Sequence, residues 1–304
     1  MSGLHWALPL LLGLTASCAP EPTPGAQRSL ALADDGGHVV RLVRPARRVV
    51  SLNPSTTELL FAIGAGSQVV ARTRWCDWPP AAARLPSVGD GFPPNIEAVL
   101  WTHPDLAVIY AAGVNRAAAL RLDELGVPVL ELRTDRLEDL ARAARVLGAA
   151  TGHTRPADSL AAAIEAGLAA AKDEARAQSP GPRVVILAWV APPLVLGSGS
   201  YLHEVVELAG GRNVFGDLAG ASGPASLEAI ASRDPDLILT VDGTPNELLR
   251  RSEWQVVRAV RERRVLAITD PALTRPTPRA LAAIVPLRAR LARTAITSPQ
   301  ELAR

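Results

Sequence analysis

Two stretches of the chain carry one pattern, IEAVLWTHPDLAVI at residues 96–109 and LEAIASRDPDLILT at residues 227–240. Five of the 14 aligned positions are identical, Glu, Ala, Pro, Asp and Leu, where average composition gives roughly one. In each stretch, apolar residues three and four apart indicate a helix, Pro-Asp ends it, and a short run of Leu, Ile or Val indicates a buried strand. The two copies lie 131 residues apart (228 − 97), which is too long a period for a solenoid. The repeat predicts two related α/β lobes.

The flanking segments repeat in the same order. Each half begins with a strand-like Arg-Val-Val, continues with a helix that has an acidic residue near its start and a glycine near its end, and closes on a β-rich run. These copies are residues 48–50, 58–64 and 127–132 in the first half, and 183–185, 204–210 and 264–269 in the second. Short apolar runs alternating with helices are typical of parallel sheets covered on both faces. We therefore expect an α/β fold whose two lobes are each a parallel sheet sandwiched between helices.

A long helix is predicted between the lobes. Leu160, Ile164 and Leu168 recur every four residues among alanines, and Ser-Pro-Gly-Pro at 179–182 ends the pattern. The 23 residues of 156–178 make a rod of roughly 34 Å at about 1.5 Å per residue. We expect an N-terminal lobe over 47–153, a bridging helix over 154–179 and a C-terminal lobe over 180–304. Because no Gly/Ser hinge is present, the lobes should move only modestly.

The first residues indicate export. Residues 1–17 contain an apolar run at 7–17, too short to span a bilayer and typical of a signal peptide. Small residues directly before Cys18 resemble the lipobox of bacterial lipoproteins, so we expect Cys18 to be lipidated; ordinary cleavage nearby is the alternative. Residues 18–46, Pro-rich at first, are predicted to be a tether. Cys76 is then left without a disulfide partner.

Composition excludes several classes of protein. The 304 residues are 48 % hydrophobic and 20 % charged, as in globular proteins rather than disordered ones. Lys and Arg number 32 against 30 Asp and Glu, a balance that argues against nucleic-acid binding. Aromatic residues are only 4 %, yet six of the 11 are tryptophans. Tryptophans in loops are therefore candidates for ligand contacts.

From Arg48 to about Leu291 the chain resembles the substrate-binding proteins of ABC importers for cobalamin, iron-siderophores and haem. The resemblance is carried by RVVSLNPSTTELLFAIGAGSQVVART at 48–73, CDWPP at 76–80, LPSVGDGFPPNIEAVLWTHPDLAVI at 85–109, LVLGSGSYLHEVVELAGGRNVF at 194–215, PASLEAIASRDPDLIL at 224–239 and TPRAL at 277–281. CDWPP followed by VGDG and NIE is most like the cobalamin branch.

The resemblance implies a periplasmic or otherwise extracytoplasmic receptor, monomeric and anchored to the membrane by its lipid. Such a receptor binds cobalamin or a related corrinoid between its lobes and delivers it to a permease dimer with its ATPase. It is not an enzyme, has no resident cofactor or metal and binds no nucleic acid. In the resemblance, one glutamate on each lobe docks onto permease arginines; here these are Glu97 and Glu228. Alternatively, each glutamate only favours the start of its helix.

The resemblance and the residue types together indicate the ligand contacts. Two departures from the cobalamin branch stand out: the tryptophans that precede each docking glutamate there fall near Gly91 and Ser222 here. We expect Trp75 to point outward and Trp78 to pack beneath its loop. The candidate ligand-binding residues are Trp75, Asp77, Trp78, Phe92, Tyr110, Trp189 and Tyr201, with Asp270 and Arg275 on the far side of the cleft.

Other functions remain as alternatives. An iron-siderophore or haem receptor of the same class is the first, with Tyr110 or Tyr201 as an axial haem ligand. A two-lobed α/β enzyme is more distant, because the chain has no G-x-S-x-G, no Walker A motif and no dinucleotide fingerprint at Gly64-Ala-Gly66. A bare-metal receptor is disfavoured, because no two histidines have helical ligand spacing.

Overall fold

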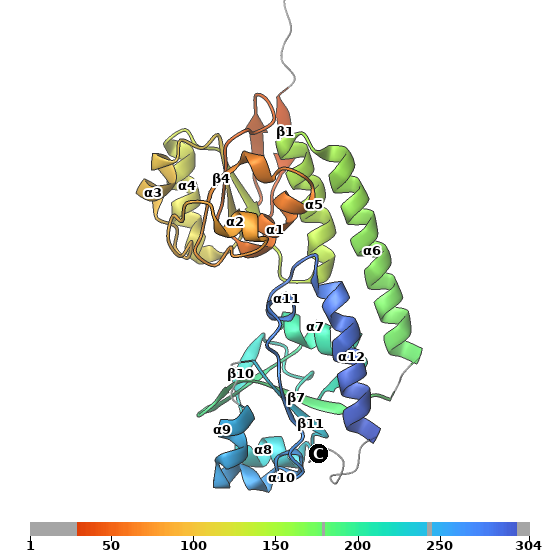
Figure 1. The fold of residues 1–304 in the computed structure, drawn as a ribbon. Coiled ribbons are helices and arrows are strands. Elements are labelled where there is room, and N and C mark those ends of the chain that lie inside the picture. The colour runs from red at the N-terminus through yellow and green to blue at the C-terminus, as the bar shows by residue number, and fades with distance from the viewer. Residues whose placement is uncertain (1–28, 178–179, 242–244, 297–304) are drawn as a thin grey trace, which may run out of the picture.

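The computed structural model describes residues 29–177, 180–241 and 245–296. It shows two α/β lobes, one above the other in Figure 1, with a long helix running along one side of both. The signal peptide, Cys18 and the Pro-rich start of the predicted tether lie outside the described residues. The expectation of two α/β lobes is confirmed.

The N-terminal lobe contains a four-stranded sheet in the order β4-β3-β5-β6, with every pair parallel. Val49 of β3 lies opposite Val69 of β4 and Leu106 of β5. The strands are β3 (Val49–Ser51), β4 (Val69–Arg72), β5 (Leu106–Tyr110) and β6 (Val129–Leu132). The helices are α1 (Pro54–Ala62), η1 (Gly66–Gln68), α2 (Pro80–Ala83), α3 (Ile96–Trp101), η2 (Gly113–Asn115), α4 (Arg116–Glu124) and α5 (Leu137–Thr151).

Alternating residues of these strands pack on opposite faces of the sheet. Val49 and Val108 belong to the apolar core that contains α1 and α5, whereas Val50 and Ile109 belong to the core that contains α3 and α4. All four side chains are fully buried. Burial on both faces explains why these strands read as continuous apolar runs in the sequence.

The C-terminal lobe contains a mixed sheet in the order β10-β8-β7-β11-β12, with β9 also paired to β7. β7, β9, β11 and β12 are parallel, but β8 and β10 are antiparallel additions. The strands are β7 (Arg183–Val190), β8 (Pro193–Leu196), β9 (Arg212–Asn213), β10 (Ser222–Pro224), β11 (Leu237–Thr240) and β12 (Val265–Ala267). The helices are α7 (Tyr201–Leu208), α8 (Leu227–Ser232), α9 (Pro245–Arg250), η3 (Ser252–Val256), α10 (Arg258–Arg261), α11 (Pro271–Thr274) and α12 (Ala280–Ile296).

The predicted parallel sheet is present in this lobe, but an antiparallel hairpin, which the sequence analysis did not predict, extends it. Only Ala191 and Pro192 separate β7 from β8, and a parallel crossover needs about a dozen residues or more. The short connection forces the two strands into an antiparallel hairpin.

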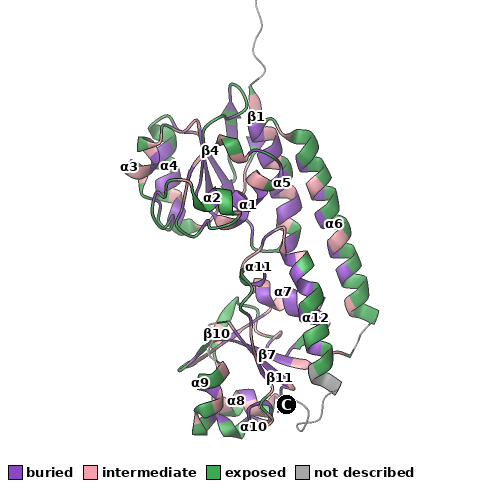
Figure 2. Cartoon of the chain, in the orientation of Figure 1, coloured by how far each residue is buried: buried purple, intermediate pink, exposed green. Residues whose placement is uncertain are grey.

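Helix α6 (Thr154–Ala177) lies along both lobes (Figure 1). Gly152, in the left-handed region at φ 80°, ends α5 and allows the sharp turn into α6. One stripe of α6 is buried while the rest is exposed (Figure 2). The helix packs on α5 in the first lobe and on α7 and α12 in the second. The buried stripe consists of Ala157, Ala161, Ile164, Leu168 and Ala171. Its residues belong to one apolar core that reaches from Leu32 to Leu291, so the lobes share buried packing.

Residues 30–42 form a β-hairpin, β1 (Leu30–Ala33) and β2 (Val39–Leu42). The prediction of a tether over 18–46 is wrong for this part. Leu32, Val40 and Leu42 are buried in the core of the N-terminal lobe. The hairpin turn also lies on β6, where the Asp35 N–H donates to the Glu131 carbonyl (2.8 Å). β6 is an edge strand of the sheet, and the hairpin turn covers part of it. Without this cover, backbone groups of β6 would be left unpaired.

The repeated Pro-Asp turn has the same hydrogen bonds in both lobes. In the first, Asp105 accepts from the N–H of Arg48 (2.8 Å), whose Nε donates to the carbonyl two residues before the aspartate (2.8 Å). In the second, Asp236 accepts from the N–H of Arg183 (2.9 Å), whose Nε donates to the equivalent carbonyl (3.2 Å). The residue bearing that carbonyl has positive φ in both copies, 49° at His103 and 37° in the second. The repeat therefore specifies one helix-turn-strand unit used twice.

Candidate functional site

A cavity of about 630 Å³ lies between the lobes. Its N-terminal wall comes from the segments that follow the parallel strands: Leu52 after β3, Thr73 after β4, Tyr110 at the end of β5 and Thr134 after β6. The carboxyl ends of parallel strands meet at one edge of a sheet, where open α/β folds bind ligands. Residues 199–201, 221 and 275–276 form the opposite wall. The cavity is the candidate ligand site.

Five of the predicted contacts line this cavity: Trp75, Phe92, Tyr110, Tyr201 and Arg275. Sequence reasoning missed several polar residues in the wall. Three of them follow the ends of β3 or β6, and that position was the signal that could have found those three. The missed residues that matter most are Asn53, Asp90, Thr134, Asp135 and Ser200.

Two aromatic rings at the cavity are largely in water. Trp75 is 55 % exposed and Phe92 is exposed to a similar extent. The Arg74 guanidinium lies 4.9 Å from the centre of the Trp75 ring and pairs with Asp90. Exposed rings gathered at a concave wall are typical of a surface that another molecule covers.

Gly91, directly before Phe92, lies where there is no room for a side chain. Gly91 has φ 78°, and a Cβ there would lie 2.4 Å from the Thr73 Cγ2 and 3.0 Å from the Leu52 carbonyl oxygen. A tryptophan at this position would need both a strained backbone and displaced neighbours. Phe92, the next residue, is the aromatic side chain that this loop brings to the cavity wall.

Both tyrosines in the wall are neutral phenols. The Tyr110 hydroxyl donates to Asp135 Oδ1 (2.5 Å), and burial together with this hydrogen bond raises the pKa of Tyr110 to about 12. Burial, followed by the charges of Glu204, Glu58 and Asp270, raises the pKa of Tyr201 even further. A phenolate ligand for iron needs the opposite shift, since the anion must be stabilised.

Arg275 and Asp77 bind each other rather than facing the ligand together. The Arg275 Nη2 donates to Asp77 Oδ1 (2.7 Å), and its Nη1 donates to the Trp75 carbonyl (2.7 Å). Asp77 lies outside the cavity wall, while Arg275 lines it. The pair connects the second lobe to the loop that carries Trp75.

Three further candidates also lie outside this wall. Trp78 is 43 % exposed, with the Arg279 guanidinium 4.4 Å from its ring centre, so the prediction that it packs beneath the loop is wrong. Asp270 caps α11 by accepting from the Ala272 N–H (2.9 Å). Trp189 is exposed near the end of β7, and its ring is not part of the wall.

Glu97 and Glu228 occupy equivalent positions in the first turns of α3 and α8. Both are exposed, and within residues 29–177, 180–241 and 245–296 neither has an ion-pair partner in this chain. Asn95 and Ser226 cap the two helices by accepting from the third N–H after them (3.0 and 3.1 Å). The pKa of Glu228 is lowered by its own backbone N–H and by the Ser226 hydroxyl. At these two equivalent positions, each lobe therefore presents a carboxylate that has no ion-pair partner among the described residues.

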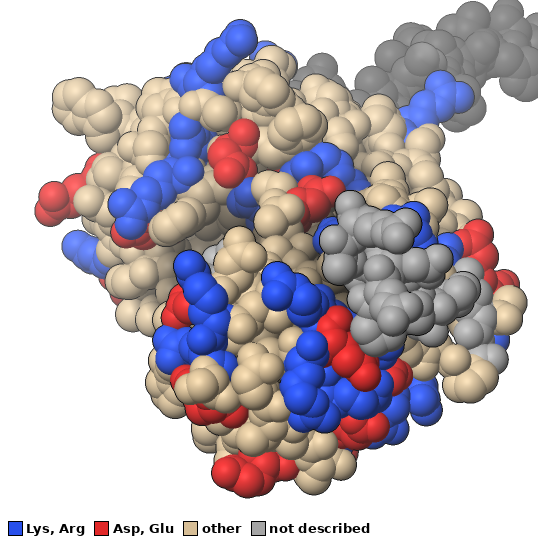
Figure 3. All heavy atoms as spheres, turned by 60° about the horizontal axis from the view of Figure 1, so that its bottom comes forward, with Lys and Arg blue, Asp and Glu red and all other residues tan. Residues whose placement is uncertain are grey.

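Among the described residues, the far end of the second lobe carries both basic and acidic side chains. Figure 3 shows basic and acidic side chains intermixed on the face where α9 and α10 lie. Arg258 illustrates the pattern, because it pairs with Asp234, Asp236 and Glu262. Such neutralised surfaces do not attract polyanions.

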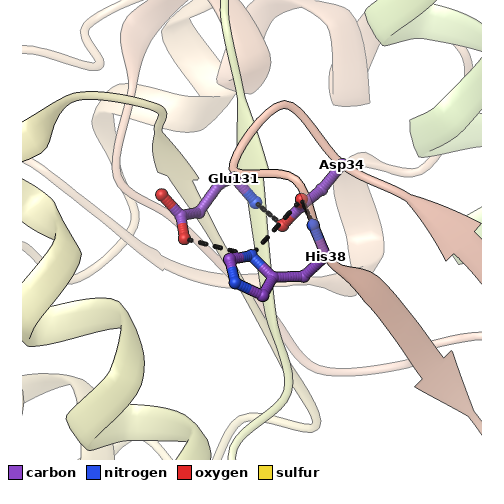
Figure 4. A group of neighbouring side chains, drawn as sticks. All are labelled: Asp34, His38 and Glu131. Atoms are coloured by element: carbon purple, nitrogen blue, oxygen red, sulfur yellow. Dashed lines mark hydrogen bonds and ion pairs between the residues drawn. The ribbon is translucent and has the colours of Figure 1, made fainter.

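One group outside the cavity has metal-ligand residue types. Asp34, His38 and Glu131 place one ligand atom each within 4.8 Å of one another (Figure 4). Arg116 already supplies the cation: its Nη1 donates to Glu131 Oε1 (2.8 Å) and lies 3.0 Å from His38 Nδ1. The group is an ion-pair network that holds the β-hairpin on β6. Sequence spacing missed it, because its members come from two distant segments.

Cys76 is buried beneath the cavity loop, with its Sγ 3.1 Å from the Thr73 hydroxyl. It is unpaired, as the cysteine count predicts. Among the residues that the structure describes, no helix has the length and apolar content that crossing a membrane requires.

Comparisons with known proteins agree with this architecture. The family model described as "Periplasmic binding protein" matches residues 49–272. The vitamin B12-binding protein of Yersinia pestis (strain Pestoides F) is 31 % identical over 240 residues, covering 78 % of this chain and 84 % of that protein.

Among solved structures, the periplasmic vitamin B12 binding protein BtuF of Vibrio cholerae has a TM-score of 0.72 at 28 % identity, covering 83 % of this chain and 99 % of that one. The periplasmic heme-binding protein RhuT from Roseiflexus sp. RS-1 in apo form has a TM-score of 0.74 at 28 % identity, covering 82 % and 99 %. These relatives are two-lobed, extracytoplasmic solute-binding proteins. With nearly three quarters of its length matched by the family model and its lobes arranged in the same way, the chain belongs to the periplasmic binding protein family.

Proposed function

We propose that this protein captures cobalamin or a related corrinoid between its lobes and delivers it to an ABC permease and its ATPase. The observation that carries the proposal is the cavity wall, where Trp75 and Phe92 expose their rings beside strand-end polar groups. A corrin is a broad, partly apolar macrocycle with amide groups around its edge. Ring faces suit the macrocycle, and hydroxyl and amide side chains such as Asn53 and Ser200 suit its edge.

The cavity chemistry favours a corrinoid over haem. Cobalt in cobalamin has its axial ligands already, whereas haem receptors supply a ligand from the protein. The described residues that line the cavity include no histidine, cysteine or methionine. Tyr110 and Tyr201 are its two phenols, and both have raised pKa values. Haem and iron-siderophores are the alternative ligands, since relatives that bind haem share this fold.

Delivery would use Glu97 and Glu228. Carboxylates that have no ion-pair partner among the described residues, one at the equivalent position of each lobe, suit arginines on two subunits of a permease dimer. We further propose that the receptor is a monomer held at the membrane surface through lipid on Cys18. Such an anchor keeps it near the transporter without a spanning helix.

Calorimetric titration with cyanocobalamin, haemin and a ferric siderophore, each into purified protein, tests the ligand. The proposal expects saturable heat with cyanocobalamin at micromolar protein and no saturation with the other two. The absence of binding heat with cyanocobalamin would exclude a corrinoid as the ligand. A Soret band of the protein with haem that is lost in Tyr110→Phe would establish haem as the ligand instead.

Uptake measured in cells tests delivery. The double variant Glu97→Ala/Glu228→Ala should abolish uptake while leaving ligand affinity unchanged. Glu124→Ala removes an exposed acid of the first lobe that pairs with Arg121, and should have no effect. Loss of uptake and affinity together in the double variant would contradict docking.

A further inference from the structure

Trp101 is 84 % exposed, the largest exposed fraction among the large apolar side chains of the described residues. It is the last residue of α3. The ring therefore contributes little to packing within the protein. An indole that stays in water is the residue type most enriched among the dominant contacts of protein interfaces.

Trp101 and Glu97 lie on one face of α3. They are four residues apart in the helix, a spacing that places their Cβ atoms about 6 Å from each other. Glu97 is exposed and, in the ranges the structure covers, has no cation from this chain beside it. A carboxylate next to an indole face suits a guanidinium, which donates in its plane to the carboxylate while its flat face stacks on the ring.

The second lobe lacks this pair. The 131-residue offset places Ser232 at the position of Trp101, at the end of α8, which carries Glu228. The Ser232 hydroxyl donates to the Ala229 carbonyl of its own helix (3.1 Å). The two helices are otherwise alike in length, capping and the position of the glutamate. Their exposed faces therefore differ by one aromatic ring.

We infer that Trp101 and Glu97 together bind an arginine of the permease subunit that faces the N-terminal lobe. This inference rests on the proposed function, and it makes the two docking contacts unequal. The first lobe holds its arginine by an ion pair and a ring face. The second holds its arginine by the ion pair alone.

The affinity of full-length, ligand-loaded variants for the cognate permease–ATPase complex, reconstituted in lipid nanodiscs, tests the inference. Trp101→Ala should bind about tenfold more weakly, as truncation of a central interface tryptophan does. Trp101→Phe keeps a ring face and should stay within about threefold of the unmodified protein. Trp101→Leu should lose as much as Trp101→Ala, and Ser232→Ala is the matched control that should change nothing. Unchanged cyanocobalamin affinity shows that each variant is folded.

The outcomes separate the two proposals. If Glu97→Ala and Glu228→Ala weaken docking but Trp101→Ala does not, this inference is wrong and the proposed function stands. If the unmodified protein does not bind the transporter at all, the proposed function fails and this inference fails with it. If Trp101→Leu binds like the unmodified protein, the partner is apolar and the arginine assignment is overturned. A dimer in sedimentation experiments that Trp101→Ala disrupts would show that a second copy covers the ring instead.

Discussion

The Arg279 guanidinium donates two parallel hydrogen bonds to the Glu58 carboxylate, from Nε to Oε2 at 2.9 Å and from Nη2 to Oε1 at 2.8 Å. Glu58 lies on α1 of the first lobe and is only 5 % exposed, whereas Arg279 directly precedes α12 of the second lobe. Bidentate geometry makes such an ion pair strong and directional. This ion pair, beside the one between Arg275 and Asp77, connects the lobes across the boundary that also forms the cavity.

Removing Arg279 should destabilise the protein. Arg279→Ala leaves the buried Glu58 carboxylate without its cation, and we expect the free energy of unfolding to fall by about 2–3 kcal/mol. Urea denaturation followed by circular dichroism measures the change. Arg176→Ala, which breaks an exposed pair with Asp173, is the control and should cost less than about 0.5 kcal/mol. Equal losses of unfolding free energy in both variants would show that the pair between Arg279 and Glu58 contributes no more to stability than an exposed ion pair.

Ionisation of Asp236 should make the stability of the fold depend on pH in the acidic range. Burial pushes the pKa of this carboxyl upward, but the Arg183 N–H and the Arg258 guanidinium outweigh burial, so the net shift is downward. A lowered native pKa contributes stability that is present above the ordinary value near 4 and is lost as pH falls through the native value. Asp236→Asn should cost about 1 kcal/mol at pH 7, and this deficit should shrink as the pH falls below about 4. A deficit that is constant with pH would contradict the role of the charge.

Tyr110 should resist ionisation. Its pKa of about 12 means that less than half of it is phenolate at pH 11, and absorbance at 295 nm reports this directly because the chain has only two tyrosines. The raised pKa contributes stability that is present below pH 10 and lost as pH rises through about 12. Asp135→Asn removes an anion and should lower the titration midpoint. A midpoint near pH 10 in the unmodified protein would disprove the shift.

The exposed rings of the cavity should carry affinity. Trp75→Ala and Phe92→Ala each remove a ring face from the wall, and we expect cyanocobalamin to bind about tenfold more weakly to each by calorimetry. Trp189→Ala should have a smaller effect, because Trp189 lies outside the wall. Trp101→Ala, on α3, is the control with unchanged ligand affinity. If Trp189→Ala caused the largest loss, the ligand would bind further along β7 than the cavity described here.

Much of the fold could be predicted because the two copies of the repeated sequence form the same secondary-structure elements. The pattern around Glu97 and Glu228 encodes a cap, a short helix, a Pro-Asp turn and a strand, and both copies form them. The hairpin over 30–42 was missed although its signal is present. Residues 30–33 and 39–42 flank a turn containing Gly36 and Gly37, and a glycine turn between short apolar runs is typical of a hairpin.

The candidate site was less predictable, because it depends on where side chains point. Tyr110, the last residue of β5, lines the cavity because the ends of parallel strands converge at one edge of a sheet, whereas Asn53 and Thr134, which follow β3 and β6, were missed. Trp189 lies beside an antiparallel hairpin whose register shifts between Leu187 and Trp189, so its direction could not be inferred. Glu58 and Arg279 lie 221 residues apart in the sequence, so no local sequence pattern could predict that they form an ion pair.

The continuous packing of α6 against both lobes has a consequence for the transporter. We expect a receptor braced by α6 along both lobes to keep nearly the same spacing between them with and without a ligand. If the protein acts as proposed, that spacing would not signal occupancy, and the transporter would have to recognise the ligand or the loops at the opening of the cavity. Release of the ligand would then require the transporter to separate the lobes.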